Sequence, residues 1–438
     1  MLDLSQLQEQ LQRATRSQSE TRGLRRQQGE RAVRTLREIG NDWVELQREV
    51  EAAQPRRLVA ALRTDPATRC EAPDRPPEVT VVATDGSQIY PDRHVEPAYF
   101  LLNIGRVAFH YGTTEAPVLD AVPDLRFPDD LDAHFDEVLA TMTTEIVSAL
   151  RDEQELAELL TLAQQEQRAE RALVALADGT LIRWMLRGMQ NREVEQELIE
   201  RYTQMLSGFM EASLPVASYV SMPGNTEVVN LLRFYLDELD EDVDRQRSQQ
   251  RSASLKASGG AETGVDHKRN GSTTSGDGAA GTNGREETRG EDEPEQPEPP
   301  LSGLLDRHLF AKVLQPGQRS AVFGSTSHIQ REYPEGNEIC YFYVRVPVSD
   351  AVQEIARVEI PAWVADDADH VDLIHSVLLA ECRKGSGYPL ILSEAHERAV
   401  IRAHERDAFQ RLLDQTLRRA GVPTSGSRKR QSKRRPKV

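Results

Sequence analysis

VTVVATDGSQIY, residues 79–90, is the strongest indicator of the fold of this chain. Its β-branched run up to Thr84 is typical of an interior strand, and the Asp-Gly that follows allows a sharp turn where the Asp85 carboxylate emerges. A second stretch, LVALADGTLIRW at residues 173–184, ends an apolar run at Asp178 in the same way. Asp-Gly alone is ordinary turn chemistry. Two copies in one strand context predict two carboxylates that the ends of two buried strands deliver to a single metal-binding site.

Composition bounds the architecture of this 438-residue chain. From about Arg245 to Pro300 it is rich in small, polar and acidic residues with almost no aliphatic side chain, which is typical of a disordered insertion. The remainder is long enough for one large α/β core with helical additions. We therefore expect an N-terminal helical, coiled-coil-like segment (1–70), a first part of the core (78–244), the disordered insertion (245–300), a second part of the core (301–420) and a basic disordered tail (421–438).

Charge, hydropathy and cysteine content exclude several classes of protein. No run of about 18 apolar residues is present, and the N-terminus lacks the apolar region of a signal peptide, so we expect a cytoplasmic protein without membrane segments. The three cysteines lack metal-binding spacing and fit a reducing compartment. The formal net charge of −17 argues against nonspecific nucleic-acid binding over the whole surface. The tail from Arg428 to Lys437 is basic without any acid, so it either holds a phosphate backbone loosely or is simply solvated.

Apolar periodicity predicts the order of helices and strands. Near the N-terminus, residues at three-and-four spacing from Val33 to Val50 form a coiled-coil-like stripe, suited to an intramolecular hairpin or, with slight preference, to a dimer contact. Besides the strands that end at Asp85 and Asp178, we expect strands at 98–103, 107–111, 216–221, 341–346 and 357–360, with the first two joined at Gly105. We expect helices at about 1–50, 136–172, 191–211, 227–239 and 365–384, and an irregular stretch up to about residue 132.

The order of these elements carries a prediction about the fold. A strand with Asp85, further strands, a Glu-rich helix and a strand with Asp178 follow one another as in ribonuclease-H-like nucleases. We therefore expect an α/β fold with a ribonuclease-H-like mixed sheet core, helical additions and an N-terminal coiled-coil-like helix. Metal-assisted phosphodiester cleavage needs oxygen ligands that hold one or two hard cations, about 3.5 to 4 Å apart when there are two. Asp85, one glutamate of the helix and Asp178 would supply such ligands.

Several glutamates compete for the helix position. Those between the two strands are Glu145, Glu153, Glu155, Glu158, Glu166 and Glu170. Glu155 and Glu158 lie beside the apolar face formed by Leu156, Leu159 and Leu162, so either could point toward a buried edge. We prefer Glu155, with Glu158 as the alternative.

The segment GSGYPLILSEAHERAVI, residues 385–401, places Tyr388 and His396 eight residues apart. Ser393 is a plausible N-cap, which would put His396 in the first turn of a helix. A histidine there can be a metal ligand or a general base, and a tyrosine hydroxyl can contact a phosphate oxygen. Taken alone, each of these residues is more often structural.

Four motifs together resemble the NurA nuclease family. They are ATDGSQIYPDRH (83–94), ALADGTLIRW (175–184), PVASYVSMPGNTEVVNLLR (215–233) and GYPLILSEAH (387–396), in the family's order over about residues 80 to 400. The resemblance implies a ribonuclease-H-like core and manganese-dependent cleavage of DNA, with magnesium as the alternative ion, by a 5′-to-3′ exonuclease that is also a single-strand endonuclease. It implies a ring-like homodimer that works with a hexameric HerA-type translocase in DNA end resection during double-strand-break repair. The long insertion matches nothing in the family.

Carried over residue by residue, the family's acids fall on Asp85, Glu155 and Asp178, and its C-terminal tyrosine and histidine fall on Tyr388 and His396. The resemblance thus implies metal ligands at Asp85, Glu155 and Asp178, with His396 as a further ligand or as the base and Tyr388 placing the scissile phosphate.

Two other functions would use the same residues. A metallohydrolase of small phosphoesters is one, but the chain lacks a phosphate-cradling glycine loop or a Walker-type lysine. The other is a non-catalytic clamp that binds DNA or a translocase.

The second Asp-Gly motif carries Thr180 where the first has a serine, a change that leaves Asp178 in place. Because no ATP-binding motif is present, duplex unwinding would need a partner.

Overall fold

The computed structural model describes residues 4–90, 95–96, 98–127, 144–187, 192–237, 300–348, 353–422 and 425–426. The chain divides into two compact units, residues 1–31 with 233–302 and residues 32–232 with 303–438. Most of helix α1 (Leu4–Ile39) belongs to the first unit. There the Gln28 side-chain amide joins the two segments of the unit, because it donates hydrogen bonds to the carbonyls of Pro300 (2.6 Å) and Ser302 (3.1 Å). The predicted insertion and basic tail lie almost wholly outside the described residues.

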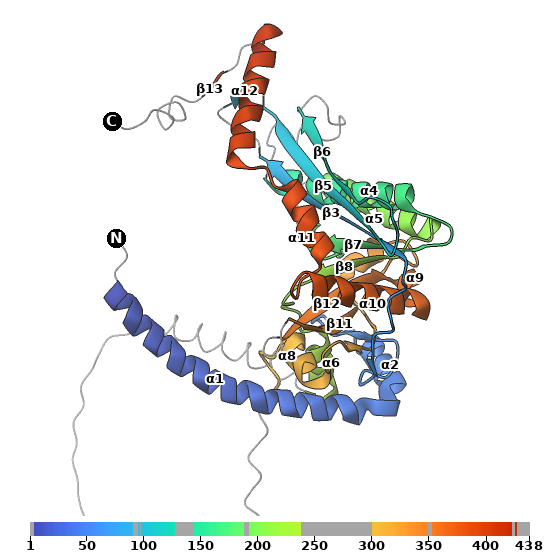
Figure 1. Cartoon of the computed structure of the whole chain (residues 1–438). Helices are drawn as coiled ribbons and strands as arrows, with labels where there is room; N and C mark the ends of the chain where they lie inside the picture. Colours follow the sequence, from blue (N-terminus) through green and yellow to red (C-terminus); the bar gives the residue numbers. More distant parts are fainter. Residues whose placement is uncertain are drawn as a thin grey trace, which may run out of the picture. The chain divides into compact units, whose positions relative to one another are not determined.

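The second unit contains a mixed sheet of eleven strands among the described residues (Figure 1). Five of them run side by side in the order β6-β5-β3-β7-β8. Their bounds are β3 (Val79–Ile89), β5 (Phe100–Tyr111), β6 (Val118–Arg126), β7 (Ala172–Asp178) and β8 (Val216–Val220). The β3–β5 and β5–β6 pairs are antiparallel, whereas β3–β7 and β7–β8 are parallel.

Two helices complete this arrangement. In the sequence, α4 (Thr144–Glu166) lies between β6 and β7, and α5 (Arg192–Glu211) lies between β7 and β8. Parallel neighbours need such crossover connections. The strand order, the strand directions and the helix positions are those of a ribonuclease-H-like core, so the predicted fold class is confirmed.

The sheet continues beyond β8 with antiparallel strands. β12 (Gln353–Pro361) pairs with β8, β11 (Ile339–Pro347) pairs with β12, and short strands follow. These are β1 (Ala61–Leu62), β2 (Arg69–Cys70), β9 (Arg319–Ser320) and β10 (Phe323–Gly324), while β4 (Val95–Glu96) and β13 (Ser425–Gly426) form a separate ladder. The remaining helices described are α2 (Trp43–Ala53), α6 (Glu227–Tyr235), α8 (Asp306–Val313), α9 (Ala362–Ala365), α10 (Ala368–Lys384), α11 (Leu390–Ala399) and α12 (Ala403–Arg419).

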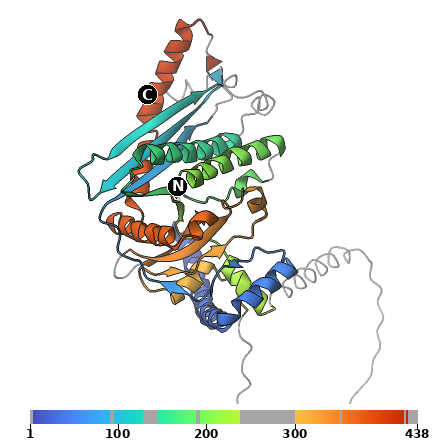
Figure 2. The same cartoon turned by 90° about the vertical axis from the view of Figure 1, so that its right-hand side faces the viewer.

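Side-chain alternation along the strands divides the core into two layers. Val82 and Ala175 pack with α4 and α5 on one face, and these two helices lie side by side (Figure 2). Val81 and Leu176 point the other way and pack with α10 and α11. Because both faces are covered, β3 and β7 are apolar on both sides, which explains their nearly continuous apolar runs.

Three element predictions are wrong. The strands expected on either side of Gly105 are one continuous strand, β5. The stretch expected to be irregular contains β6, whose residues are mostly exposed or half-buried at the sheet edge and therefore leave no apolar run. The sharp turn expected after Asp85 is absent, because β3 continues to Ile89.

The N-terminal stripe is largely buried within the chain. Leu36, Ile39, Leu46 and Val50 are each at most 4% exposed. The helix is also interrupted at Gly40, which adopts a positive φ of 40° between α1 and α2. This burial favours the intramolecular alternative over a dimer contact. Among the described helices, none is both long and apolar enough to cross a membrane.

Candidate active site

The two Asp-Gly motifs meet at one edge of the sheet. The parallel pair β3 and β7 is in register up to Ala83 and Leu176, so Asp85 and Asp178 each follow two residues after the last pair. Beyond that point β3 stays bonded to β5, and β7 to β8, so β3 and β7 separate where the acids lie. Burial raises the pKa of Asp178, and the charge of Asp85 raises it further, as expected for neighbouring carboxyl groups.

The two glycines serve different purposes. Gly179 has a φ of +81° at the end of β7, where the left-handed backbone favours glycine and produces the predicted turn. Gly86 lies inside β3, and a Cβ there would be only 2.4 Å from Glu155 Oε1 and 2.8 Å from Arg151 Cγ. The glycine after Asp85 therefore provides space for side chains of α4 that cross the strand.

Helix α4 brings Glu155 rather than Glu158 to this edge. The Thr84 hydroxyl donates to the main-chain carbonyl of Glu155 (2.8 Å), which docks α4 on β3 beside Asp85. Glu158 instead pairs with Arg106 Nη1 at 3.2 Å. Burial raises the pKa of Glu155 to about 8; Arg151 opposes this shift, and the charge of Asp85 adds to it.

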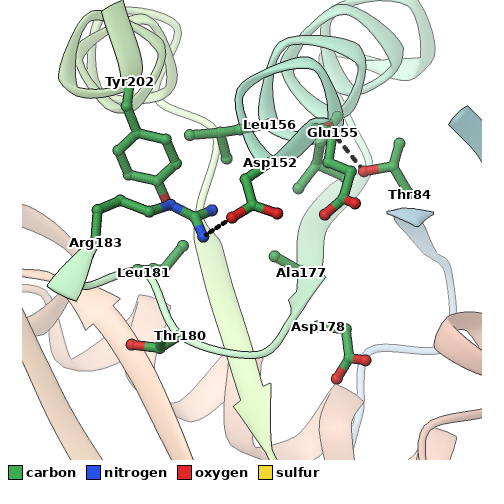
Figure 3. Close-up of a pocket in the computed structure, with 11 residues that line it drawn as sticks. Thr84, Asp152, Glu155, Leu156, Ala177, Asp178, Thr180, Leu181, Arg183 and Tyr202 are labelled. Carbon is green, nitrogen blue, oxygen red and sulfur yellow. Dashed lines mark hydrogen bonds and ion pairs between the residues drawn. The ribbon is translucent and has the colours of Figure 1, made fainter. Parts of the chain in front are cut away.

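Sequence reasoning missed three charged neighbours of Glu155. Arg151 Nε lies 2.9 Å from Glu155 Oε1, and Arg151 Nη2 donates to Asp152 Oδ1 at 2.7 Å. Arg183 Nη1 donates to the second oxygen of Asp152 at 3.1 Å, and Figure 3 shows this pair beside Glu155 in a small pocket. Asp152 stands three residues before Glu155, on the same helix face, and that spacing is the signal that could have identified it.

His396 reaches Asp85 from the opposite side of the sheet. Its Nδ1 lies 2.7 Å from Asp85 Oδ2, while its side chain is 65% exposed. Gly105 pairs with Asp85 across β3 and β5, and a Cβ on it would lie 2.4 Å from the carbonyl oxygen of Ala395. Glycine at this strand position therefore allows α11 to approach closely enough for His396 to meet Asp85.

Tyr388 contacts the second acid. Its hydroxyl lies beside the Asp178 carboxylate, an interaction that opposes the rise in the pKa of Asp178. Burial, followed by the Asp178 charge, raises the pKa of Tyr388, so its hydroxyl stays protonated at neutral pH. The ring packs edge-on against Tyr219 of β8, with centroids 5.3 Å apart.

The predicted start of the last helix of the site is wrong. Helix α11 begins at Leu390, so Ser393 lies inside it and His396 lies in its last turn. The buried Glu381 carboxylate accepts a hydrogen bond from the Ile391 N–H (2.9 Å) and satisfies the helix start that Ser393 was expected to cap. The cap comes from α10, which the local sequence pattern does not reveal.

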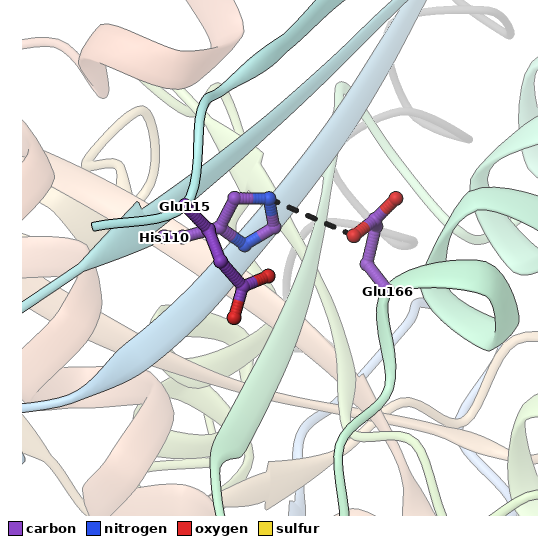
Figure 4. A group of neighbouring side chains, drawn as sticks. All are labelled: His110, Glu115 and Glu166. Atoms are coloured by element: carbon purple, nitrogen blue, oxygen red, sulfur yellow. Dashed lines mark ion pairs between the residues drawn. The ribbon is translucent and has the colours of Figure 1, made fainter. Parts of the chain in front are cut away.

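A second cluster lies elsewhere on the sheet. The ligand atoms of His110, Glu115 and Glu166 lie within 4.8 Å of one another (Figure 4), and among the described residues the acids around Asp85 do not form a group this close. His110 is five residues beyond Gly105 on β5, or roughly 17 Å from the Asp85 edge. Arg171 donates to both oxygens of Glu115 (2.6 and 3.2 Å), and Arg168 lies 3.5 Å from Glu166. Arginines thus already neutralise these carboxylates.

Comparisons with known proteins bear on this site. Similar solved structures are the NurA nuclease from Sulfolobus solfataricus (TM-score 0.45, 12% identity, 80% of this chain and 88% of that chain), a structure of NurA (0.32, 12%, 78% and 90%) and LC9-RNase H1, a type 1 RNase H with the type 2 active-site motif (0.21, 12%, 37% and 72%). No curated protein matches the chain. The family model of the NurA domain matches residues 79–401, a span that covers well over half of the chain and contains all five candidate residues. The chain therefore belongs to the NurA domain family.

Proposed function

We propose that this protein is a metal-dependent nuclease that hydrolyses phosphodiester bonds of DNA. The observation that carries the proposal is the meeting of five side chains from separate parts of the chain at one sheet edge: Asp85, Glu155, Asp178, Tyr388 and His396. Membership of the NurA domain family supports nuclease activity and a DNA substrate.

The donor set fits a hard divalent cation. Carboxylate oxygens suit Mn²⁺ and Mg²⁺, and an imidazole nitrogen is a further common ligand. Glu155 Oε1 is buried with Arg151 Nε 2.9 Å away, and burial still raises the pKa of both Glu155 and Asp178 despite this cation. A cation would offset the cost of burying these negative charges. We assign Asp85, Glu155, Asp178 and His396 as the residues that would hold it.

The chain's own residues have separable roles in this proposal. When bound, divalent ions here would activate a water molecule and stabilise the leaving oxygen. His396 directs Nδ1 to Asp85, which orients the ring and leaves Nε2 as the nitrogen that either binds the cation or, in the alternative role of general base, exchanges a proton with substrate or water. The Tyr388 hydroxyl, which is held beside Asp178, can donate to a phosphate oxygen and place the scissile phosphate near the acids.

The finer description rests on the resemblance of the four motifs. We propose 5′-to-3′ exonuclease and single-strand endonuclease activity with Mn²⁺, or alternatively Mg²⁺, in DNA end resection at double-strand breaks. A homodimer, a HerA-type hexameric translocase as partner and a cytoplasmic location belong to the same proposal. So does the division of the nuclease core by an insertion at 245–300.

The test is cleavage of end-labelled single- and double-stranded DNA in Mn²⁺, Mg²⁺ or chelator. We expect metal-dependent cutting by the wild type and its loss in Asp85→Ala and Asp178→Ala, with the fold intact, because a strand-end carboxylate adds charge repulsion rather than packing. Asp372→Ala is the matched control, since it removes a half-exposed carboxylate of α10 that pairs with Arg319 at 2.9 Å. It should cut like the wild type.

Other outcomes would contradict the assignment. An Asp85→Ala protein that cuts at the wild-type rate would remove these acids from the mechanism. A wild type that binds DNA but does not cut with any metal, even with a translocase added, would favour the non-catalytic clamp. Hydrolysis of small phosphoesters in place of DNA would favour the metallohydrolase.

A further inference from the structure

A buried ionic network lies behind the Asp178 loop. Arg357 on β12 is 1% exposed and pairs with Glu227 Oε1 (3.0 Å) and, through its Nε, with Glu359 Oε1 (2.8 Å). Both glutamates are 3% exposed. The guanidinium also stacks on Tyr341, with 3.5 Å between its carbon and the ring centroid. Buried ion pairs of this kind add little stability over apolar packing of the same volume. Stability alone therefore does not explain why these carboxylates are present.

The second oxygen of Glu359 leaves this network and holds the Asp-Gly-Thr loop. Glu359 Oε2 accepts hydrogen bonds from the Thr180 hydroxyl and from the Leu181 N–H, each at 2.8 Å. The Thr180 hydroxyl in turn accepts from the Ile182 N–H at 3.0 Å. One carboxylate therefore holds both Thr180 and Leu181, the second and third residues after Asp178.

The backbone on both sides of these contacts is also held. The Gly179 N–H donates to the Tyr219 carbonyl at 3.0 Å, at the end of β7. The Tyr333 hydroxyl donates to the Leu181 carbonyl (2.7 Å) and accepts from the Arg183 N–H (3.2 Å). The loop from Asp178 to Arg183 is thus attached at successive points, and Glu359 supplies the only charged anchor among these contacts.

We propose that Glu359, acting through Thr180, is a positioning residue that keeps the Asp178 carboxylate in place for a divalent cation. This inference rests on the proposed function, because it assumes that Asp178 is a metal ligand. Glu359 contacts neither the proposed metal nor the substrate. Its effect is transmitted by the Thr180 hydroxyl, which explains why a residue with a hydroxyl group follows Asp178-Gly179.

The experiment measures Mn²⁺ affinity by titration calorimetry of the full chain, with Mn²⁺ alone as the probe. Thr180→Val removes the hydroxyl at nearly constant volume and should weaken Mn²⁺ binding by about 10-fold or more, which is the usual effect of losing a partner that orients a metal ligand. Thr180→Ser restores the hydroxyl and should bind within about 2-fold of the wild type. Asp178→Ala provides the affinity expected without the ligand itself.

Tyr99→Phe is the control for general loss of stability. It removes a buried hydroxyl that donates to Gln410 Oε1 (2.9 Å), a hydrogen bond outside both the Asp178 loop and the Arg357 network. It should lower the unfolding midpoint while leaving Mn²⁺ affinity unchanged. If Tyr99→Phe weakens Mn²⁺ binding as much as Thr180→Val does, the effect is general destabilisation and the inference is wrong.

The remaining outcomes separate this inference from the proposed function. Wild-type affinity in Thr180→Val, together with weakened binding in Asp178→Ala, overturns the role of Glu359 and leaves the metal site intact. Equal Mn²⁺ binding by the wild type and Asp178→Ala overturns the proposed site, and with it this inference. If Thr180→Val does not fold, the Mn²⁺ affinity of Thr180→Ala is compared with that of Thr180→Ser, because these two variants also differ in the hydroxyl.

Discussion

Replacing Gly105 with alanine should separate His396 from Asp85. The added Cβ would lie 2.4 Å from the Ala395 carbonyl oxygen and 2.6 Å from the Ala399 nitrogen, both backbone atoms of α11. Ordinary contacts begin at 3.4 Å, so the helix or the strand must move by about 1 Å. No side-chain rotation can relieve this contact, because both atoms belong to the main chain.

The magnitude follows from that displacement. Overpacking of this kind costs about 1 to 3 kcal/mol of unfolding free energy, which a domain of this size should survive. A shift of about 1 Å at a catalytic group can lower the rate roughly 100-fold. His396 lies 2.7 Å from Asp85, so a movement of about 1 Å would break this hydrogen bond. We therefore expect a folded Gly105→Ala protein with kcat reduced about 100-fold.

The assay is Mn²⁺-dependent cleavage of end-labelled DNA by Gly105→Ala, His396→Ala and the double variant. If Gly105 acts through His396, the double variant should be little worse than His396→Ala alone. Losses that multiply in the double variant would refute the reasoning, as would wild-type kcat in Gly105→Ala. Gly324→Ala is the control, because its Cβ would lie 3.2 Å from the Ala61 side chain and no closer than 4.0 Å to the backbone oxygen of Ala61, between β10 and β1.

Two further predictions concern protons. Because burial raises the pKa of Glu155 to about 8, this carboxyl group is mostly protonated at pH 7, and metal binding should release its proton. Glu155→Gln should abolish this release. Calorimetry in buffers of different ionisation enthalpy measures the release, and an unchanged value in the variant would contradict the assignment. Burial lowers the pKa of His375 from 6.5 to about 4, so below pH 6.5 the unfolded chain binds a proton that the folded chain excludes. The His375 contribution alone should therefore lower the stability of the wild type by about 3 kcal/mol as the pH falls from 6.5 to 4. His375→Gln should lack this loss. The measurement is the denaturant midpoint of both proteins between pH 6.5 and 4, and the same pH dependence in both would contradict the prediction.

Local sequence patterns indicated much of the core. The runs before Asp85 and Asp178 mark two strands that are buried on both faces, and the Glu-rich helix between them appears as α4. Parallel strands connected by a helix place their carboxyl ends at one edge, which is why two motifs about ninety residues apart predicted a shared location. The catalytic role of these residues stays a prediction.

Other features depend on contacts between distant residues. Glu155 and Glu158 lie on the same part of one helix, and only Thr84 and Arg106 on neighbouring strands determine which of them faces Asp85. The start of α11 was misjudged because its cap, Glu381, belongs to another helix.

Local sequence patterns predicted most of the elements, their order and the two acids at strand ends, but missed β6 and the continuity of β5, because turn residues and hydrophobic periodicity act over a few positions. Contacts between distant elements determine which glutamate lies beside those acids, why Gly86 and Gly105 are glycines, and that Glu359 anchors the loop of Asp178. These facts concern close packing between elements brought together by folding, where a single methyl group or one oxygen changes the geometry. No pattern within a short window of sequence contains that information.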